Sequence, residues 1–220
     1  MTLPAIEIET APQPQASIIW LHGLGADGGD FVSVAHEIQL PVGVRYVFPH
    51  APEMPVTING GYVMRAWYDI AYQDFALQED EAGVRASQAA VEKLIVREQQ
   101  RGVAPRRIVL AGFSQGGAIA LFAALRHPQR LAGVMALSAY LPLPHTLAAE
   151  RSAANNETPI FMAHGLYDNI VPPALAQASR RQLEQAGYSV EWREYPMPHA
   201  VCEEEIRDIE QWLGRVLKSG

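Results

Sequence analysis

Residues 107–125 constrain the fold of this chain more than any other segment. They combine an apolar run that indicates a buried strand, the pentapeptide Gly112-Phe-Ser-Gln-Gly116, and a run of small apolar residues that indicates a helix. The pentapeptide fits G-x-S-x-G, in which a serine lies at a sharp strand-to-helix turn. Such a turn strains the serine backbone by about 1–3 kcal/mol. It also requires glycine on both sides, because strand and helix pass too close for a Cβ. A glycine-rich turn without chemistry is the alternative that this segment alone leaves open.

Composition limits the kinds of protein that this chain can be. The 220 residues are 49% apolar and 19% charged, which predicts one soluble globular domain over 1–220. A net charge of −7 argues against nucleic acid as a partner, since nucleic-acid binding needs a clustered basic face. Cys202 is the single cysteine, so no internal disulfide is expected. The N-terminus lacks the basic start and apolar core of a secretory signal, and we therefore expect a cytoplasmic protein.

The uncharged run 108–125 is long enough to cross a membrane. It is interrupted at its centre by Gly112, Ser114 and Gly116, and β-branched residues give way to alanines across that interruption. A strand followed by a buried helix explains this pattern better, so no integral membrane segment is expected.

Strands and helices are predicted to alternate along the chain. Short apolar runs predict strands, and apolar residues at helical spacing predict helices. The expected strands are 17–21, 44–48, 107–112, 131–137, 159–163 and 188–195, and the expected helices include 31–38, 79–101, 174–186 and the C-terminal segment. This alternation predicts an α/β fold with a mostly parallel sheet covered on both faces. Only about twenty residues separate the strands near Ser138 and Pro159, too few for a separate cap domain.

Two connections are expected to shape a site. Residues 22–30 hold four glycines after the first strand, and the N–H group of Leu24 is a candidate donor to an oxyanion; a plain turn and a phosphate loop are the alternatives. Asp30 is expected to cap the helix that follows. Residues 52–78 are expected to be irregular and to form a wall of the substrate site. The predicted pocket residues are Met64, Trp67, Leu77 and Val171.

The order of three residues favours nucleophilic catalysis. A serine needs a base, and a histidine base needs a carboxylate to fix its tautomer. Of the seven histidines, His199 alone follows both the acid candidates and the final predicted strand. Asp168 lies just beyond a strand, between Ser114 and His199, which gives the chain order Ser, Asp, His. Functional groups of such sheets gather at the carboxyl ends of the strands. We therefore predict a Ser114–Asp168–His199 triad.

The remaining reactive side chains are expected to be supporting or incidental. His22 and His164 follow strands and are predicted to hydrogen-bond and orient loops. Cys202 is expected to be incidental, because the sequence offers no second acid and base that could activate its thiol. No His, Cys or carboxylate spacing indicates a metal site, and no cofactor is expected.

Several motifs together resemble the phospholipase/carboxylesterase family of α/β-hydrolases, which includes bacterial carboxylesterases and acyl-protein thioesterases. They are Leu21-His-Gly-Leu-Gly25, Phe48-Pro-His-Ala-Pro52, Trp67-Tyr-Asp69, Gly112-Phe-Ser-Gln-Gly-Gly117, His164-Gly-x-x-Asp168-x-x-Val-Pro172 and Met197-Pro-His199. The resemblance runs from about residue 17 to the C-terminus. It implies an α/β-hydrolase fold, the triad named above, and an oxyanion hole formed by the N–H groups of Leu24 and Gln115. The Gly25-Ala26-Asp27-Gly28 block looks more like that of bacterial carboxylesterases.

The expected activity is hydrolysis of short- to medium-chain carboxylic esters through an acyl-enzyme, with a small or lipid-like acyl ester as substrate. The same triad would serve an acyl-protein thioesterase or a lysophospholipase. A catalytically silent binding protein of the same fold is the alternative from another class. Dimers occur in the resembling family, which makes a homodimer an expectation of the resemblance.

Overall fold

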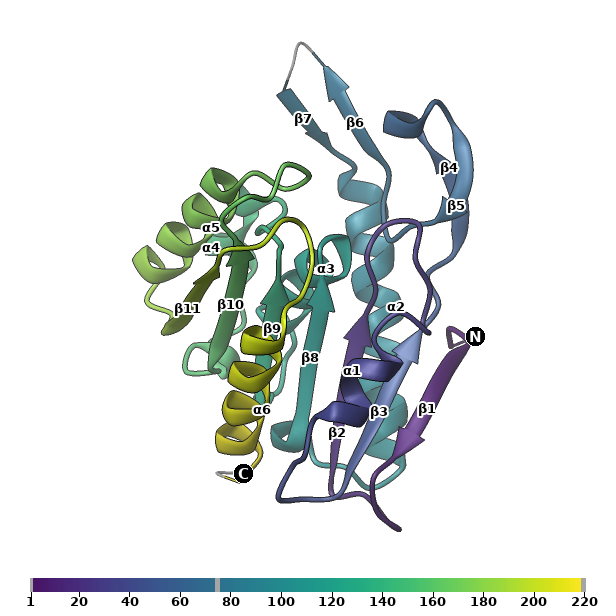
Figure 1. The fold of residues 1–220 in the computed structure, drawn as a ribbon, viewed down its shortest axis with the longest axis vertical. Helices are drawn as coiled ribbons and strands as arrows, with labels where there is room; N and C mark the ends of the chain where they lie inside the picture. The colour runs from purple at the N-terminus through teal and green to yellow at the C-terminus, as the bar shows by residue number, and fades with distance from the viewer. Residues whose placement is uncertain (1, 74–75, 219–220) are drawn as a thin grey trace.

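The computed structural model describes residues 2–73 and 76–218, with the backbone alone at 72, 73 and 76–78. In this part of the chain, seven strands form one sheet in the order β1-β3-β2-β8-β9-β10-β11 (Figure 1). These strands are β1 (Ala5–Glu9), β2 (Ala16–Leu21), β3 (Val44–Pro49), β8 (Ile108–Phe113), β9 (Gly133–Leu137), β10 (Ile160–Gly165) and β11 (Val190–Tyr195). β1 is antiparallel to β3, and the other pairings in this sheet are parallel. The carboxyl ends of the parallel strands therefore meet at one edge.

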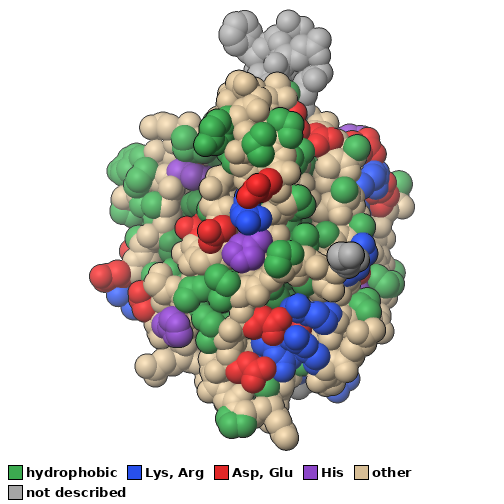
Figure 2. All heavy atoms as spheres, turned by 90° about the vertical axis from the view of Figure 1, so that its right-hand side faces the viewer, with side chains coloured by type: hydrophobic (Ala, Val, Ile, Leu, Met, Phe, Trp, Pro, Cys, Tyr) green, Lys and Arg blue, Asp and Glu red, His purple; other side chains and the backbone are tan. Residues whose placement is uncertain are grey.

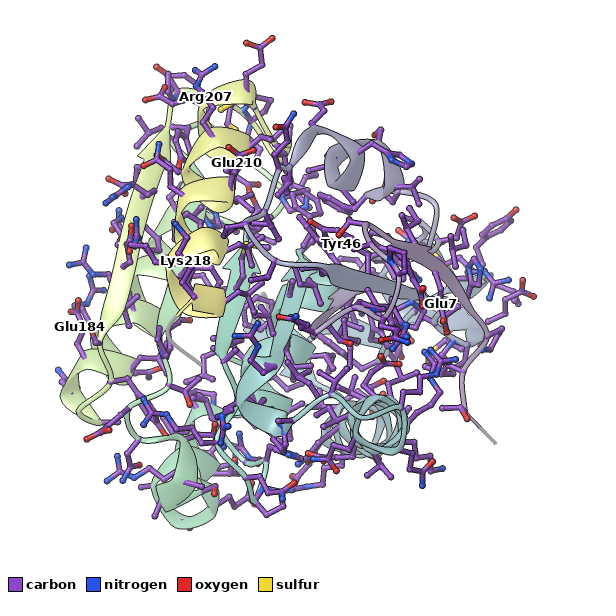
Figure 3. All side chains as sticks on the ribbon, turned by 90° about the horizontal axis from the view of Figure 1, so that it is seen from below. Glu7, Tyr46, Glu184, Arg207, Glu210 and Lys218 are labelled. Atoms are coloured by element: carbon purple, nitrogen blue, oxygen red, sulfur yellow. The ribbon has the colours of Figure 1, made fainter. Side chains whose placement is uncertain are left out.

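Helices cover both faces of the sheet. They are α1 (Val32–Glu37), α2 (Glu81–Gln100), α3 (Gln115–Ala124), α4 (Leu147–Glu150), α5 (Pro173–Gln185) and α6 (Glu203–Lys218). α1 and α6 contribute to the core on one face, and α2 to α5 contribute to the core on the other. Figure 3 views the molecule from below, with α6 labelled at Glu210 and Lys218 and the end of α5 at Glu184. The structure thus confirms a mostly parallel sheet between two helical layers.

The inner strand β2 shows why four residues in succession, 18–21, are apolar. Successive side chains of a strand point to opposite faces. Ile18 and Trp20 enter the core beneath α1 and α6, whereas Ile19 and Leu21 enter the core beneath α2 and α3. All four are buried. A strand buried on both faces has no position for a polar residue that must reach water.

The N-terminal segment corrects the sequence-based expectation, which placed no strand before residue 17. Residues 5–9 form β1, which pairs with β3 in the register Ile6–Phe48 and Ile8–Tyr46. Ile6 and Ile8 pack on the core beneath α1, and Glu7 between them and Glu9 after them face the other way. The alternating Ile-Glu-Ile-Glu is the period of an edge strand, but the flanking prolines obscured it.

The segment expected to be irregular is largely two hairpins. β4 (Glu53–Val56) pairs with β5 (Tyr62–Arg65), and β6 (Ile70–Gln73) pairs with β7 (Ala76–Glu79), both antiparallel. Figure 1 shows both hairpins beyond the carboxyl ends of the sheet. Their strands have four residues each, too short for the alternation of side chains to give a clear signal.

Asp30 does not cap the helix that follows it. α1 begins at Val32 with Phe31 at the N-cap position, and no side chain caps it. Asp27 closes the preceding turn instead, because its Oδ1 accepts from the Gly29 N–H and its carbonyl accepts from the Asp30 N–H.

Buried Glu98 anchors the β1 edge of the sheet to α2. Its carboxylate accepts hydrogen bonds from Ser17 Oγ at 2.8 Å and Arg45 at 2.9 Å, and Arg101 lies 3.2 Å away. Glu7 of β1 pairs with Arg97 and Arg101. Figure 2 shows the mixed acidic and basic surface on this side, and Figure 3 labels Glu7 there. These ionic groups hold in place the edge strand that the sequence did not reveal.

A second buried carboxyl, Glu205 in the first turn of α6, predicts a pH-dependent stability. It is fully buried, and neither oxygen has a well-formed hydrogen bond among the described residues. Burial raises the pKa of this carboxyl from 4.5 to about 8, and the nearby backbone of Cys202 offsets only part of that rise. The unfolded chain therefore loses this proton at lower pH than the folded chain does. At 1.36 kcal/mol per pKa unit, the free energy of unfolding falls by about 4 kcal/mol as the pH rises from about 4.5 to 8.

Glu205→Gln is expected to remove this pH dependence. Denaturant unfolding should give similar stabilities for variant and wild type near pH 4.5 and a more stable variant at pH 8. Glu204→Gln is the matched control, because it removes the same charge from the same turn at an exposed position. If the two variants have the same profile of stability against pH, Glu205 is ionised in the folded protein and the expectation is wrong.

Candidate active site

Ser114 lies in the sharp turn between β8 and α3 that its motif predicts. Its φ of 54° and ψ of −122° belong to a sparsely populated region for a residue with a side chain. A Cβ on Gly112 would overlap the backbone of Gly116, and a Cβ on Gly116 would overlap the carbonyl groups of Leu21 and His22. The steric need for glycine at both positions is confirmed. The turn leaves Ser114 directly before the first N–H groups of α3, which lack helical acceptors.

Asp168 and His199 are joined by a hydrogen bond beyond the ends of β10 and β11. His199 Nδ1 lies 2.7 Å from Asp168 Oδ2. The other oxygen, Oδ1, accepts from the N–H groups of Ile170 and Val171, each at 2.9 Å. Asp168 is buried, and the His199 side chain is 16% exposed. The carboxylate is therefore fixed by its own loop and presents one oxygen to the imidazole.

His199 is placed beside the strand end that carries Ser114. Its ring packs against Phe113, with 4.7 Å between the ring centroids. The loop before it crosses close over β10, where a Cβ on Gly165 would overlap the carbonyl oxygens of Met197 and Pro198. The three predicted triad residues thus come from the ends of three strands at one edge of the sheet, as shown by the strand order.

His164 supports the Asp168 loop. Its Nε2 lies 2.8 Å from the carbonyl oxygen of Val171 and 3.3 Å from Asp168 Oδ2. Burial lowers the pKa of this imidazole, which favours the neutral ring. A neutral ring with Nε2–H donates to the Val171 carbonyl and closes the loop 165–171.

An open cavity of about 380 Å³ lies against Ser114. Aliphatic side chains form most of its wall, to which Tyr68 and Tyr140 also contribute, and the hydroxyl oxygens of these two tyrosines lie 2.8 Å apart. Its lining residues are Leu24, Ile58, Asn59, Tyr68, Ile70, Ser114, Gln115, Tyr140, Asn169, Ile170, Val171, Pro172 and Leu175. Such a mainly apolar hollow with few polar groups suits a small organic ligand.

The predicted pocket residues differ in their relation to this cavity. Val171 lines it. Trp67 is buried and Met64 lies beside Gly25, and neither is among the residues that line the cavity. The side chain of Leu77 is outside the described residues.

The side chain of Gln115 has a connection that was not predicted from the sequence. Its Oε1 accepts from the Trp67 N–H at 2.8 Å, and its Nε2 donates to the Tyr68 carbonyl at 2.7 Å. The turn that carries Ser114 is thereby joined to the segment that supplies Tyr68 to the cavity. A glutamine within the elbow motif is the available sequence signal, although no local pattern identifies its partner.

Neither a metal centre nor a membrane span is found in the part of the chain that the structure describes. In residues 2–73 and 76–218, no three His, Cys, Asp or Glu side chains converge as a metal site would require. Within the same ranges, no helix has the length and apolar character needed to cross a bilayer.

The sheet, the strained serine turn and the Asp–His pair define an α/β-hydrolase fold. The chain belongs to the Phospholipase/Carboxylesterase family, whose model matches residues 2–217. Acyl-protein thioesterase 1 of Neurospora crassa is 40% identical over 221 residues, which cover 96% of this chain and 90% of that protein. Acyl-protein thioesterase 1 of Cryptococcus neoformans var. neoformans is 36% identical over 236 residues, or 99% of both chains. The crystal structure of Zea mays acyl-protein thioesterase 2 matches with a TM-score of 0.83 and 28% identity, covering 97% of this chain and 100% of that chain.

Proposed function

We propose that this protein is a serine hydrolase that cleaves acyl esters through a covalent acyl-enzyme. The observation that carries the proposal is the hydrogen-bonded Asp168–His199 pair beside the strained turn of Ser114. His199 Nδ1 donates to the carboxylate, so its Nε2 is left to accept a proton from the serine. Ser114 Oγ then attacks the acyl carbonyl and forms a tetrahedral intermediate.

The negative oxygen of this intermediate would be held by the N–H groups of Leu24 and Gln115. Both residues line the cavity beside Ser114, and Gln115 is the first residue of α3. Protonated His199 gives its proton to the leaving alcohol or thiol as the intermediate collapses to the acyl-enzyme. Water then attacks with His199 as base, which releases the acid and restores Ser114.

The cavity favours an acyl group of short to medium length. Its volume of about 380 Å³ is near the lower end of the usual 300–1,000 Å³ range of ligand pockets. Ile58, Ile70 and Leu175 give it an aliphatic wall. We therefore expect kcat/KM to rise with acyl chain length until the cavity is filled and then to fall.

Thioester hydrolysis is the second candidate, favoured by the names of the curated relatives, which are acyl-protein thioesterases. The same attack on the acyl carbonyl would release a thiol. Because a thiol has a pKa of about 8.5, it leaves with less help from His199 than an alcohol does.

Two measurements test these proposals. A fluorophosphonate should label Ser114, located by mass spectrometry of the digested protein, and a chain that stays unlabelled would be a binding protein of this fold. Oxygen esters and thioesters with the same acyl chain should then be compared by kcat/KM across a chain-length series. A preference for thioesters at every length would assign thioester hydrolysis as the main activity.

A further inference from the structure

Hydrogen bonds fix two successive carbonyl groups in the loop that follows β2. The carbonyl of His22 accepts from the indole Nε1–H of Trp67 at 2.8 Å. The carbonyl of Gly23 lies 2.7 Å from His22 Nδ1 and also accepts from the Ala26 N–H at 3.3 Å. Beyond them, the Gly25 N–H donates to the Arg65 carbonyl at 2.9 Å. Among the described residues, the Leu24 N–H between these bonds has no acceptor.

The carbonyl of Gly23 and the N–H of Leu24 belong to one peptide group. A trans peptide is planar, and its C=O and N–H point in opposite directions. A hydrogen bond that holds the Gly23 carbonyl toward the His22 ring therefore turns the Leu24 N–H away from that ring. Leu24 lines the cavity together with Ser114. The orientation of this unpaired N–H is thus set by the two donors to the Gly23 carbonyl, of which His22 Nδ1 at 2.7 Å is nearer than the Ala26 N–H at 3.3 Å.

The second nitrogen of His22 determines the form of the ring. The Ala51 N–H donates to His22 Nε2 at 3.0 Å, so Nε2 carries no proton and Nδ1 carries the proton of the neutral ring. Burial also lowers the pKa of this imidazole. Nδ1 is then the donor, and the carbonyl of Gly23 is its acceptor.

Trp67 is itself held firmly in the protein interior. Its N–H donates to Gln115 Oε1, its carbonyl accepts from Ser87 Oγ, and its ring packs 5.3 Å from the ring of His22. It is buried and does not line the cavity. Its indole N–H therefore holds the carbonyl of His22 in the loop after β2. The sequence had instead suggested that this side chain contacts the substrate.

We propose that His22 and Trp67 are positioning residues that aim the Leu24 N–H at the oxyanion of the tetrahedral intermediate. This inference rests on the proposed acyl-enzyme function. A donor that meets the oxyanion only in the transition state affects kcat, and its misorientation leaves the binding of the ground-state substrate unchanged.

Two substitutions at His22 separate its two hydrogen bonds. In His22→Asn the amide nitrogen lies near the position of Nδ1 and keeps a donor for the Gly23 carbonyl. In His22→Gln the amide oxygen lies near the position of Nε2 and keeps an acceptor for the Ala51 N–H. Loss of an oxyanion donor costs about 10²–10³ in kcat. We expect a loss of roughly 10–100-fold in His22→Gln from a misdirected donor, with KM within about twofold, and a smaller loss in His22→Asn.

Trp67→Phe tests the second contact, and Trp20→Phe is its matched control. Both tryptophans are buried, but Trp20 Nε1 has no hydrogen-bond partner among the described residues. Trp67→Phe is expected to lower kcat about tenfold, as a displaced oxyanion donor would. Trp20→Phe should leave kcat unchanged.

Inhibitor binding distinguishes positioning from general support of the fold. An alkyl trifluoromethyl ketone adds to Ser114 and forms a tetrahedral oxyanion, whereas the carboxylic acid product binds without one. In His22→Gln and Trp67→Phe, the inhibition constant of the ketone should rise by the same factor by which kcat/KM falls, and that of the acid should stay constant. Equal weakening of both inhibitors, or a His22→Asn variant less active than His22→Gln, would overturn the inference.

Failure of the positioning roles can be separated from failure of the proposed function. If His22→Gln does not fold, the comparison of Trp67→Phe with Trp20→Phe decides whether the positioning roles hold. If Ser114 takes no fluorophosphonate in the wild type, the proposed function fails. If Ser114 is labelled and kcat is unchanged in both His22→Gln and Trp67→Phe, only the positioning roles fail.

Discussion

Ser114→Ala is expected to lower kcat for an activated ester by roughly 10⁶-fold, as removal of a triad nucleophile does in serine proteases. The loss follows from deleting the only atom that can form the acyl-enzyme in the proposed reaction. The fold should be unaffected, because Ser114 Oγ makes no hydrogen bond within the described residues and alanine keeps the Cβ at this turn. Steady-state hydrolysis and thermal unfolding of the same preparation measure both quantities.

Ser138→Ala provides a matched control for that experiment. Ser138 also has a positive φ, 47°, and it follows the neighbouring strand β9. It is fully buried, and its Oγ has no hydrogen-bond partner in the part of the chain that the structure describes. Removing an unsatisfied buried hydroxyl should be neutral or stabilising. Activity in Ser114→Ala within tenfold of that in Ser138→Ala would refute the nucleophile assignment.

The features predicted well from sequence are those determined by local sterics. The elbow requires glycine at 112 and 116 because of contacts formed within a few residues and with the adjacent strand β2. The parallel sheet follows from apolar runs that alternate with helical patterns. The triad residues stay a prediction, yet the sheet brings the ends of β8, β10 and β11 to one edge, where all three lie.

The features that were missed depend on partners distant in sequence. β1 is stabilised by pairing with β3 and by ion pairs of Glu7 with Arg97 of α2 and with Arg101, which follows α2. The cavity wall draws Ile58, Tyr140 and Leu175 from three separate segments, and no periodic pattern identifies them together. Trp67 was expected at the substrate because it lies in the long segment 52–78, which was predicted to form a wall of the site. Its indole N–H instead bonds the carbonyl of His22, 45 residues away.

Asp168→Asn is expected to lower kcat by about 10⁴-fold, the effect of the corresponding change in a serine protease triad. In the structure Asp168 Oδ1 accepts hydrogen bonds from two backbone N–H groups. The side-chain oxygen of an asparagine would therefore take the position of Oδ1. Its NH₂ group would then face His199 Nδ1, now 2.7 Å from Oδ2. Two donors cannot share this contact, and the imidazole would move its proton to Nε2. An Nε2–H cannot accept the proton of Ser114.

The loss in kcat is expected without a loss of folding, since the side-chain oxygen at position 168 would still accept hydrogen bonds from the N–H groups of Ile170 and Val171. Asp208→Asn is the control, because Asp208 is a partly buried carboxylate on α6 that accepts from Tyr195 OH and is expected to have no part in catalysis. It should keep kcat within a few-fold and lose only some stability. If Asp168→Asn instead loses less than tenfold, the carboxylate is a structural brace of its loop. In that outcome the catalytic tautomer of His199 would not depend on the carboxylate. The ring contact with Phe113 would not account for it either, because that contact offers no hydrogen bond to select one tautomer over the other.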